Sequence, residues 1–219
     1  MQSPVGFTEE ELEAGRRLFA GDCRFLLGVA DAASLPDAAL PEIAVAGRSN
    51  VGKSSLLNAL TGRRDVARIS KSPGRTRQIN VFRLAGGGRE TILADCPGYG
   101  YARAPKAEIA AWTRLIRTYL KGRPQLVRVL LLIDARHGVK PADIEMMSLL
   151  DEAAVSYQLV LTKLDKLKPG ARDAAVEAAD DAARKHIACH PVVHATSSAK
   201  GWGLEALRAE LALLATAQG

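Results

Sequence analysis

Residues 47–54 read Gly47-Arg48-Ser49-Asn50-Val51-Gly52-Lys53-Ser54, which matches the pattern G-x-x-x-x-G-K-S. The apolar run EIAVA precedes this stretch and the run LLNAL follows it, so it lies between an expected strand and an expected helix. Glycines let the backbone curl until several N–H groups converge, and a helix start adds partial positive charge. An ordinary glycine-rich turn needs neither lysine nor serine at these positions. The stretch therefore predicts a phosphate-binding loop.

The residues of this loop have distinct expected roles. Lys53 is expected to reach the β- and γ-phosphates of a nucleotide, and Ser54 to supply a hydroxyl ligand to Mg²⁺. The full set expected to surround the phosphates is Gly47, Arg48, Ser49, Asn50, Val51, Gly52, Lys53, Ser54 and Ser55.

A second part of the same site follows the expected strand ETILAD. Asp95-Cys96-Pro97-Gly98 has the form D-x-x-G, and a carboxylate at the end of such a strand faces the ligand crevice of the sheet. We expect Asp95 to hold Mg²⁺ through water and the Gly98 amide to contact the γ-phosphate. Cys96 is expected to be a small residue at a buried strand end rather than a redox sensor.

The base-binding part is expected after the strand YQLVL, where Thr162-Lys163-Leu164-Asp165 resembles the [NT]-K-x-D guanine motif of small GTPases. The Asp165 carboxylate would accept hydrogen bonds from the guanine N1–H and exocyclic amine, a donor pair that adenine lacks. An unpaired buried carboxylate costs roughly a few kcal/mol, so the motif favours GTP over ATP. Lys163 is expected to lie along the base plane, and Thr162 to brace the phosphate loop.

The string Ser197-Ser198-Ala199-Lys200 follows the last expected strand, PVVHAT. It resembles the base-contacting SAK loop of the same GTPases, and its expected guanine-binding residues are Ser197, Ser198 and Ala199.

Apolar strands alternate with helices from residue 42 onward. A hairpin is expected from INVFRLA and ETILAD, further strands from LVRVLLLID, YQLVLT and PVVHAT, and helices near residues 106–121, from 141, 170–187 and 204–215. Such alternation is typical of a mostly parallel sheet with helices on both faces. We predict an α/β P-loop GTPase domain with six strands, one of them an antiparallel edge strand. Residues 1–39, with a short helix near 9–19, are expected to form an N-terminal extension to a G domain of residues 40–219.

Longer strings resemble one branch of bacterial GTPases. PEIAVAGRSNVGKSSLLNAL, SPGRTRQINVF and DCPGYGYA, followed by LLLIDARHGVKPADIEMMSLL and VLTKLDKL, resemble the EngB family of ribosome-biogenesis GTPases, also called YihA or YsxC. The resemblance covers nearly all of residues 24–212, and PGYGYA is its most specific part. It implies a GTP-dependent assembly factor for the large ribosomal subunit or its precursor, required for bacterial growth and division.

The resemblance also implies a switch I segment between residues 63 and 78. Ser70, Ser72 and Thr76 all have suitable hydroxyls, and the family favours Thr76 as the residue that closes on Mg²⁺ and the γ-phosphate. The expected catalytic set is therefore Lys53, Thr76, Gly98 and Asn50.

Many GTPases carry a glutamine after D-x-x-G that orients the attacking water, whereas this chain has Tyr99. We expect slow intrinsic hydrolysis unless another group helps. Relatives with an asparagine at the place of Asn50 can bind K⁺ against the transition state. The alternative is that Asn50 only shapes the loop and a partner completes the site. Equal rates in K⁺ and Na⁺ would eliminate the K⁺ hypothesis.

The net charge of +6 suggests an anionic partner, with nucleic acid ahead of membrane, and two basic groups fit an RNA partner. The first lies in the switch I segment and comprises Arg63, Arg64, Arg68, Lys71, Arg75 and Arg77. The second is expected largely on one helix face and comprises Arg114, Arg117, Lys121 and Arg123. Phosphate contacts of this kind give affinity that falls steeply with salt. Two alternatives stay open: a solvated loop, and a GTP-gated module that binds a protein partner in cell division without RNA contact.

Composition points to an ordinary globular chain, with 47% hydrophobic and 25% charged residues. Cys23, Cys96 and Cys189 show no metal-ligand spacing and fit a reduced cytoplasm. No apolar run approaches the roughly 20 residues needed to span a bilayer. We therefore expect a cytoplasmic, monomeric protein that does not bind membranes.

Overall fold

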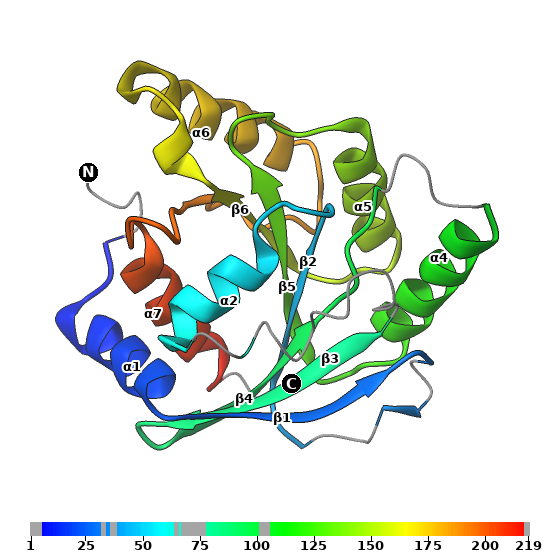
Figure 1. Ribbon diagram of the computed structural model, residues 1–219, viewed down its shortest axis with the longest axis horizontal. Helices are drawn as coiled ribbons and strands as arrows, with labels where there is room; N and C mark the ends of the chain where they lie inside the picture. The colour runs from blue at the N-terminus through cyan, green and yellow to red at the C-terminus, as the bar shows by residue number, and fades with distance from the viewer. Residues whose placement is uncertain are drawn as a thin grey trace.

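The computed structural model of the chain describes residues 6–31, 34–35, 39–63, 66, 78–100 and 106–216. Over these residues a sheet of order β1-β3-β4-β2-β5-β6-β7 has helices on both faces (Figure 1). Its strands are β1 (Asp22–Val29), β2 (Glu42–Gly47), β3 (Ile79–Gly86), β4 (Arg89–Asp95), β5 (Leu126–Asp134), β6 (Tyr157–Thr162) and β7 (His194–Ala195). The helices are α1 (Glu9–Ala20), α2 (Lys53–Thr61), α4 (Lys106–Lys121), α5 (Pro141–Glu152), α6 (Pro169–Ala183), α7 (Leu204–Leu214) and the short 3₁₀ helix η2 (Leu164–Lys166). The predicted α/β class is confirmed.

Two details of the predicted sheet are wrong. The sheet has seven strands rather than six, because residues 22–29 of the expected extension form β1. β3 runs antiparallel to both β1 and β4, so the antiparallel strand lies second from the edge rather than at the edge. β1 escaped prediction because it is itself an edge strand, in which exposed and partly buried positions alternate along the sequence DCRFLLGV.

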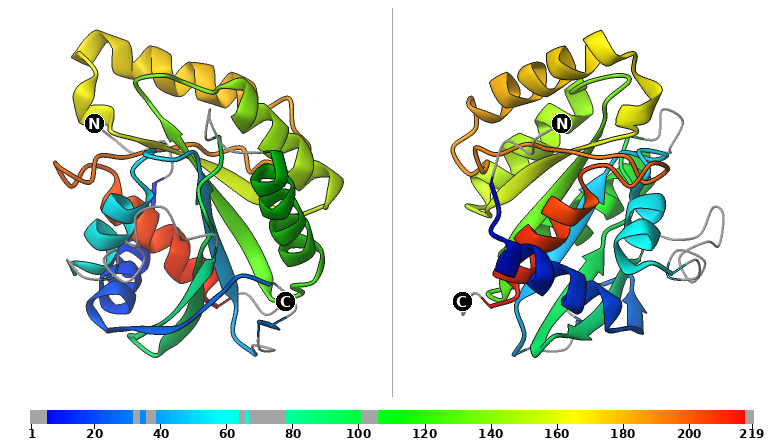
Figure 2. Two further views of the ribbon diagram at one scale, coloured as in Figure 1. Left: turned by 45° about the vertical axis from the view of Figure 1, so that its right-hand side comes forward. Right: turned by 90° about the vertical axis from the view of Figure 1, so that its left-hand side faces the viewer.

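The core consists of one hydrophobic cluster on each face of the sheet. Figure 2 shows the helices that cover the two faces. In β2, Ile43 and Val45 pack with α1, α2 and α7, whereas Ala44 and Ala46 pack with α4, α5 and α6. All six residues of β2 are buried, which explains its unbroken apolar run.

Helix α1 packs on α7 and belongs to the hydrophobic cluster on the α1, α2 and α7 face of the sheet. Thr8 caps it: its hydroxyl accepts from the Glu11 N–H, while the Glu11 carboxylate accepts from the Thr8 N–H. Leu18 is fully buried. The close approach requires Gly15, because a Cβ there would stand 2.6 Å from the backbone nitrogen of Ala209.

The C-terminal third differs from expectation in two boundaries. Helix α6 ends at Ala183 rather than near residue 187, and β7 covers only residues 194–195 of the expected PVVHAT strand. The chain before β7 also meets the start of β6, where the His190 N–H donates to the Tyr157 carbonyl, but Pro191 has no N–H with which to continue the ladder to residue 194.

The prediction of a basic helix face is also wrong at one residue, Arg123. Arg123 is buried and its guanidinium lies 2.6 Å from a carboxylate oxygen of buried Glu42, whose other oxygen accepts from the Tyr119 hydroxyl at 2.5 Å. Arg114, Arg117 and Lys121 remain exposed on α4. The surface group on α4 is therefore these three residues. No helix in the described ranges has the length and apolar character needed to cross a bilayer.

Candidate nucleotide-binding site

The predicted phosphate loop joins the end of β2 to the start of α2. Gly52, at the N-cap of α2, has a φ of 109°, a conformation that favours glycine. Gly47 is equally restricted by space, because a Cβ there would lie 2.9 Å from a Val51 methyl. No described side chain caps α2, so its first N–H groups face outward toward the loop, as an anion site requires.

Lys53 and Asp95 meet at the base of this loop. The Lys53 ammonium lies 2.7 Å from a carboxylate oxygen of Asp95, and the Asp95 side chain is only 4% exposed. The contact arises because β4 lies next to β2 in parallel, with Asp95 opposite Val45. The ion pair thus joins the lysine expected at the phosphates to the carboxylate expected at Mg²⁺.

The residues present fit a magnesium ion bound together with a nucleotide. Ser54 is the second residue of α2 and half-buried, and Asp95 ends the neighbouring strand. Mg²⁺ in phosphate sites takes one or two protein oxygens and completes its shell with water and phosphate oxygens. Ser55 follows, exposed, in the same helical turn.

The Thr162-Lys163 pair holds the phosphate loop from the neighbouring part of the sheet. The Thr162 hydroxyl donates to the Val51 carbonyl at 2.6 Å, which is the bracing contact expected of it. The Lys163 ammonium donates to the Asn50 carbonyl at 2.5 Å, and both Asn50 and Lys163 have left-handed backbone conformations. The base motif and the phosphate loop therefore form one unit.

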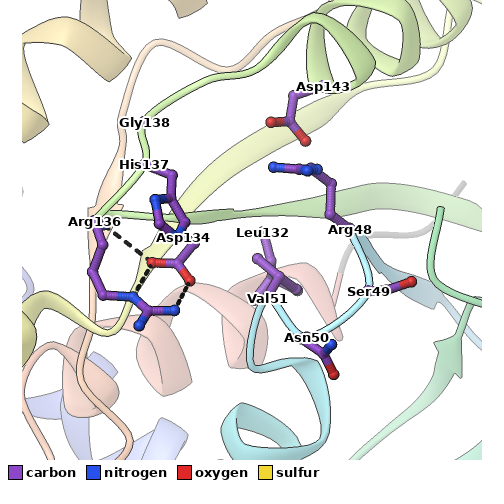
Figure 3. A pocket seen from close by; sticks show the side chains of 10 residues that line it. All are labelled: Arg48, Ser49, Asn50, Val51, Leu132, Asp134, Arg136, His137, Gly138 and Asp143. Atoms are coloured by element: carbon purple, nitrogen blue, oxygen red, sulfur yellow. Dashed lines mark hydrogen bonds and ion pairs between the residues drawn. The ribbon is translucent and has the colours of Figure 1, made fainter. Parts of the chain in front are cut away.

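Asp134 belongs to this unit, although the sequence interpretation missed it. It ends β5 and accepts from the Lys163 ammonium at 2.9 Å. It also accepts from the Arg136 guanidinium at 2.7 Å (Figure 3). Partial burial alone would raise the pKa of Asp134, but the hydrogen bonds from Arg136 and Lys163 outweigh it and hold the pKa well below its usual range. The available signal was an acid at a strand end, as at Asp95.

Asp165 is oriented by the loop after β7. The Ser197 hydroxyl donates to an Asp165 carboxylate oxygen at 2.7 Å, and Lys166 lies 3.4 Å from the other oxygen. The hydrogen bond from Ser197 lowers the pKa of Asp165, so the carboxylate stays ionised. This is the form that would accept from both guanine donors.

The loop that carries Ser197 is itself braced. The Ser197 N–H donates to the Trp202 carbonyl at 3.0 Å, and the Arg172 guanidinium stacks 4.5 Å from the centre of the Trp202 ring. Ser198 is half-buried and Ala199 exposed in the same turn. Neither Arg172 nor Trp202 carries a sequence signal for this role.

The D-x-x-G segment lies directly against the phosphate loop. A Cβ on Gly98 would stand 3.2 Å from the Ser49 hydroxyl, and Cys96 is buried, as expected for a structural residue. Tyr99 is buried as well, and its hydroxyl donates to Asp143 of α5 at 2.7 Å. A hydroxyl bound to α5 cannot orient a water at the phosphates as a glutamine does, in keeping with the absence of that glutamine from the sequence.

A cavity of about 190 Å³ lies between the phosphate loop, the end of β5 and the start of α5 (Figure 3). It is distinct from the Lys53–Asp95 pair and from Asp165, none of which lines it. Its lining residues are Arg48, Ser49, Asn50, Val51, Leu132, Asp134, Arg136, His137, Gly138 and Asp143.

Part of the predicted site falls outside the described residues. This concerns Thr76 and most of the basic switch I group, namely Arg64, Arg68, Lys71, Arg75 and Arg77. Arg63 is described, and its guanidinium donates to the carbonyls of Gly21 and Cys23 beside β1.

Comparison with known proteins agrees with the geometry. Residues 42–163 match a family model described as "50S ribosome-binding GTPase". The chain is 54% identical to a probable GTP-binding protein EngB of Rhodospirillum rubrum, over 97% of this chain and 95% of that protein. It is also 54% identical to a protein of the same description from Hyphomonas neptunium, with 95% of each chain covered.

Solved structures show the same fold. A crystal structure of a probable GTP-binding protein engB aligns with a TM-score of 0.61 at 24% identity, covering 79% of this chain and 97% of that one. Era in complex with MgGDPNP and a segment of 16S ribosomal RNA aligns with a TM-score of 0.66 at 24% identity, covering 82% of this chain and 58% of that one. With the phosphate loop, the D-x-x-G aspartate and the braced base motif all in place, the chain belongs to the EngB family of GTP-binding proteins and is a GTPase.

Proposed function

We propose that this protein is a GTP-dependent switch that acts in the assembly of the large ribosomal subunit in bacteria. The observation that carries the proposal is the match of residues 42–163 to a family described as a 50S ribosome-binding GTPase. This span contains the phosphate loop, the D-x-x-G segment and the Thr162-Lys163 pair that braces the loop.

In the proposed cycle, the loop of residues 47–55 binds the nucleotide phosphates through its N–H groups and Lys53. Ser54 and, through water, Asp95 would hold Mg²⁺, which would supply positive charge against the phosphate oxygens. The Gly98 amide and Thr76 contact the γ-phosphate, so both contacts disappear on hydrolysis.

In the same cycle, Asp165 selects guanine. Lys163 lies along the base plane, and Ser197, Ser198 and Ala199 line the base from the loop after β7. The hydrogen bond from Ser197 to the Asp165 carboxylate supports this assignment, because it fixes the orientation of the selecting group.

Hydrolysis is proposed to be slow in the isolated protein. The Tyr99 hydroxyl donates to Asp143 and so does not face the phosphates. This supports the proposal that the site has no water-orienting side chain at position 99. Either K⁺ held near Asn50 or a ribosomal partner would then complete the site. A hydrolysis rate at least several-fold higher in K⁺ than in Na⁺ would support the ion, and equal rates would support the partner.

An RNA-facing surface is proposed on α4. Arg114, Arg117 and Lys121 are exposed there, and Arg117 lies 3.5 Å from Glu152, a weak surface contact that leaves it available to phosphates. Residues three and four apart share a helix face, so the three charges form a stripe. Such a stripe gives salt-sensitive binding with little sequence preference.

Co-sedimentation with purified ribosomal subunits tests the proposal. We expect binding to the large subunit with a non-hydrolysable GTP analogue and much less with GDP. Arg114→Ala with Lys121→Ala should weaken this binding. The slope of log affinity against log salt concentration should fall by about one to two, one for each lost phosphate contact. The matched control is Glu145→Ala with Glu177→Ala, which removes two exposed charges of opposite sign from α5 and α6. Absence of binding in both nucleotide states would overturn the ribosomal role and favour a protein partner in cell division.

A further inference from the structure

The D-x-x-G segment is held by the phosphate loop through its backbone. The Ser49 N–H donates to the Tyr99 carbonyl at 3.0 Å, and the Tyr99 N–H donates to the Gly47 carbonyl at 3.3 Å. These two bonds make a short parallel bridge between the loop and the residue that follows Gly98. The position of the Gly98 amide therefore depends on where Tyr99 is held.

Tyr99 is flanked by two glycines, Gly98 and Gly100, which leave the backbone free to take many conformations. Gly100 already has a φ of 73°, in the left-handed region. The two backbone bonds to the phosphate loop hold this segment on one side, and a side-chain anchor on the other side restricts its geometry further. Tyr99 is the only residue of Gly98-Tyr99-Gly100 with a side chain beyond hydrogen.

The anchor is a buried hydrogen bond to α5. The Tyr99 hydroxyl donates to one Asp143 oxygen at 2.7 Å, and the Lys140 N–H donates to the other at 2.8 Å. Asp143 is 1% exposed and lies in the first turn of α5. One carboxylate thus joins the start of α5 to the D-x-x-G segment.

Two neighbours complete the arrangement. The Trp112 ring of α4 packs on Tyr99, with 5.7 Å between ring centres, and its N–H donates to the Pro97 carbonyl at 3.0 Å. The Arg48 side chain of the phosphate loop points toward the Asp143 carboxylate (Figure 3). Burial raises the pKa of that carboxyl, and the charge of Arg48 partly offsets the rise. The segment before and after Gly98 is therefore fixed to α4, to α5 and to the phosphate loop.

We propose that Tyr99 and Asp143 are positioning residues that hold the Gly98 amide where it meets the γ-phosphate, and so set the affinity for GTP relative to GDP. This inference rests on the proposed γ-phosphate contact of Gly98. Because GDP lacks that phosphate, loss of the Tyr99–Asp143 bond weakens binding of a GTP analogue and leaves GDP binding nearly unchanged. A purely structural role would weaken both nucleotides alike.

The experiment compares Kd values for GDP and for a non-hydrolysable GTP analogue in three single variants and in the double variant of Tyr99→Phe with Asp143→Ala. Tyr99→Phe keeps the ring on Trp112 and removes the hydroxyl, and Asp143→Ala removes its acceptor. The matched control is Tyr119→Phe, which removes another buried hydroxyl that donates to a buried carboxylate, Glu42, near the start of β2. Thermal unfolding of all variants measures the loss of stability separately.

For Tyr99→Phe and Asp143→Ala we expect about tenfold weaker binding of the analogue, a change of about 1.4 kcal/mol, with GDP affinity within about twofold of wild type. The double variant should lose no more than the larger single one, because both remove the same bond. Tyr119→Phe should lose stability but keep the ratio of the two affinities.

An unchanged ratio in Tyr99→Phe, or an equal change in Tyr119→Phe, would overturn the inference. Should one variant fail to fold, the other still tests it, since each removes one partner of the bond. A wild-type protein that binds neither nucleotide would instead contradict the proposed function, so the two failures are distinguishable.

Discussion

At the scale of single residues, the proposed base site combines an ionised carboxylate with a hydroxyl that fixes its direction. Asp165 accepts from Ser197 on one oxygen, and the adjoining Lys163 spans the phosphate loop and Asp134. Since recognition depends on an acceptor aimed at two guanine donors, replacing the acceptor by a mixed donor and acceptor should change which base is bound.

Asp165→Asn should weaken GTP binding by on the order of 100-fold, because its amide N–H₂ would face a guanine donor. Binding of xanthosine triphosphate should improve, since xanthine offers a carbonyl oxygen in place of the exocyclic amine. Titration with both nucleotides measures the change. Ser197→Ala is the matched control: it keeps the carboxylate and should weaken GTP much less. A variant that still preferred GTP would argue against Asp165 as the selecting group.

At the scale of elements, the helices are held to the sheet by a few close or buried contacts. Gly15 lets α1 approach the α7 backbone, and Arg123 joins the segment after α4 to the start of β2 through Glu42. In addition, Arg208 of α7 donates to the carbonyls of Ala59 and Leu60 at the end of α2. Each contact suggests a substitution that should loosen one element.

Gly15→Ala should destabilise the protein by about 1–3 kcal/mol, because the new methyl would overlap the α7 backbone. Gly170→Ala is the control within α6, where a Cβ would meet nothing within 4 Å. There the better helix propensity of alanine should leave stability equal or raise it by up to about 1 kcal/mol. Urea unfolding of both variants and of the wild type measures these changes in the free energy of unfolding. Equal stability of the two would show that α1 can shift away from α7 without loss.

Arg123→Met should lower the free energy of unfolding by about 3–5 kcal/mol, since it leaves the buried Glu42 carboxylate without its cation. Adding Glu42→Gln should recover part of the loss, because the stranded charge is removed as well. Chemical denaturation of the single and double variants measures this. If Arg123→Met proved as stable as wild type, the ion pair would have no net role in holding α4.

At the scale of the whole molecule, the site exists because the strands end at one edge of the sheet. Parallel strands bring their last residues to the same edge, here Gly47 of β2, Asp95 of β4, Asp134 of β5 and Thr162 of β6.

The stability of the whole chain depends on pH through one buried histidine of β7. His194 is 3% exposed, and burial lowers its pKa to about 4, with help from the nearby charges of His190 and Arg128.

His194 should make the protein less stable as the pH falls from about 6.5 to about 4. In that window the unfolded chain binds a proton at this histidine and the folded chain does not. The free energy of unfolding therefore falls by up to roughly 3 kcal/mol. His194→Gln, which cannot titrate, should flatten this part of the stability curve, measured by denaturant unfolding between pH 7 and pH 4. His137→Gln removes an exposed imidazole and serves as control. An identical slope in His194→Gln and wild type would contradict the assignment.

The sequence by itself determined the fold class and the family, and it located the motifs of the candidate site. The string of residues 47–54, the aspartate at 95 and the pair at 162–163 are local patterns at the ends of strands, and such patterns can be interpreted from spacing and chemistry alone. Only the tertiary structure decided the rest: β1 as a seventh strand, the burial of Arg123, and the Tyr99–Asp143 anchor. The last two join residues 81 and 44 positions apart. Pairings over such distances depend on how helices pack against the sheet, and no local periodicity records that packing.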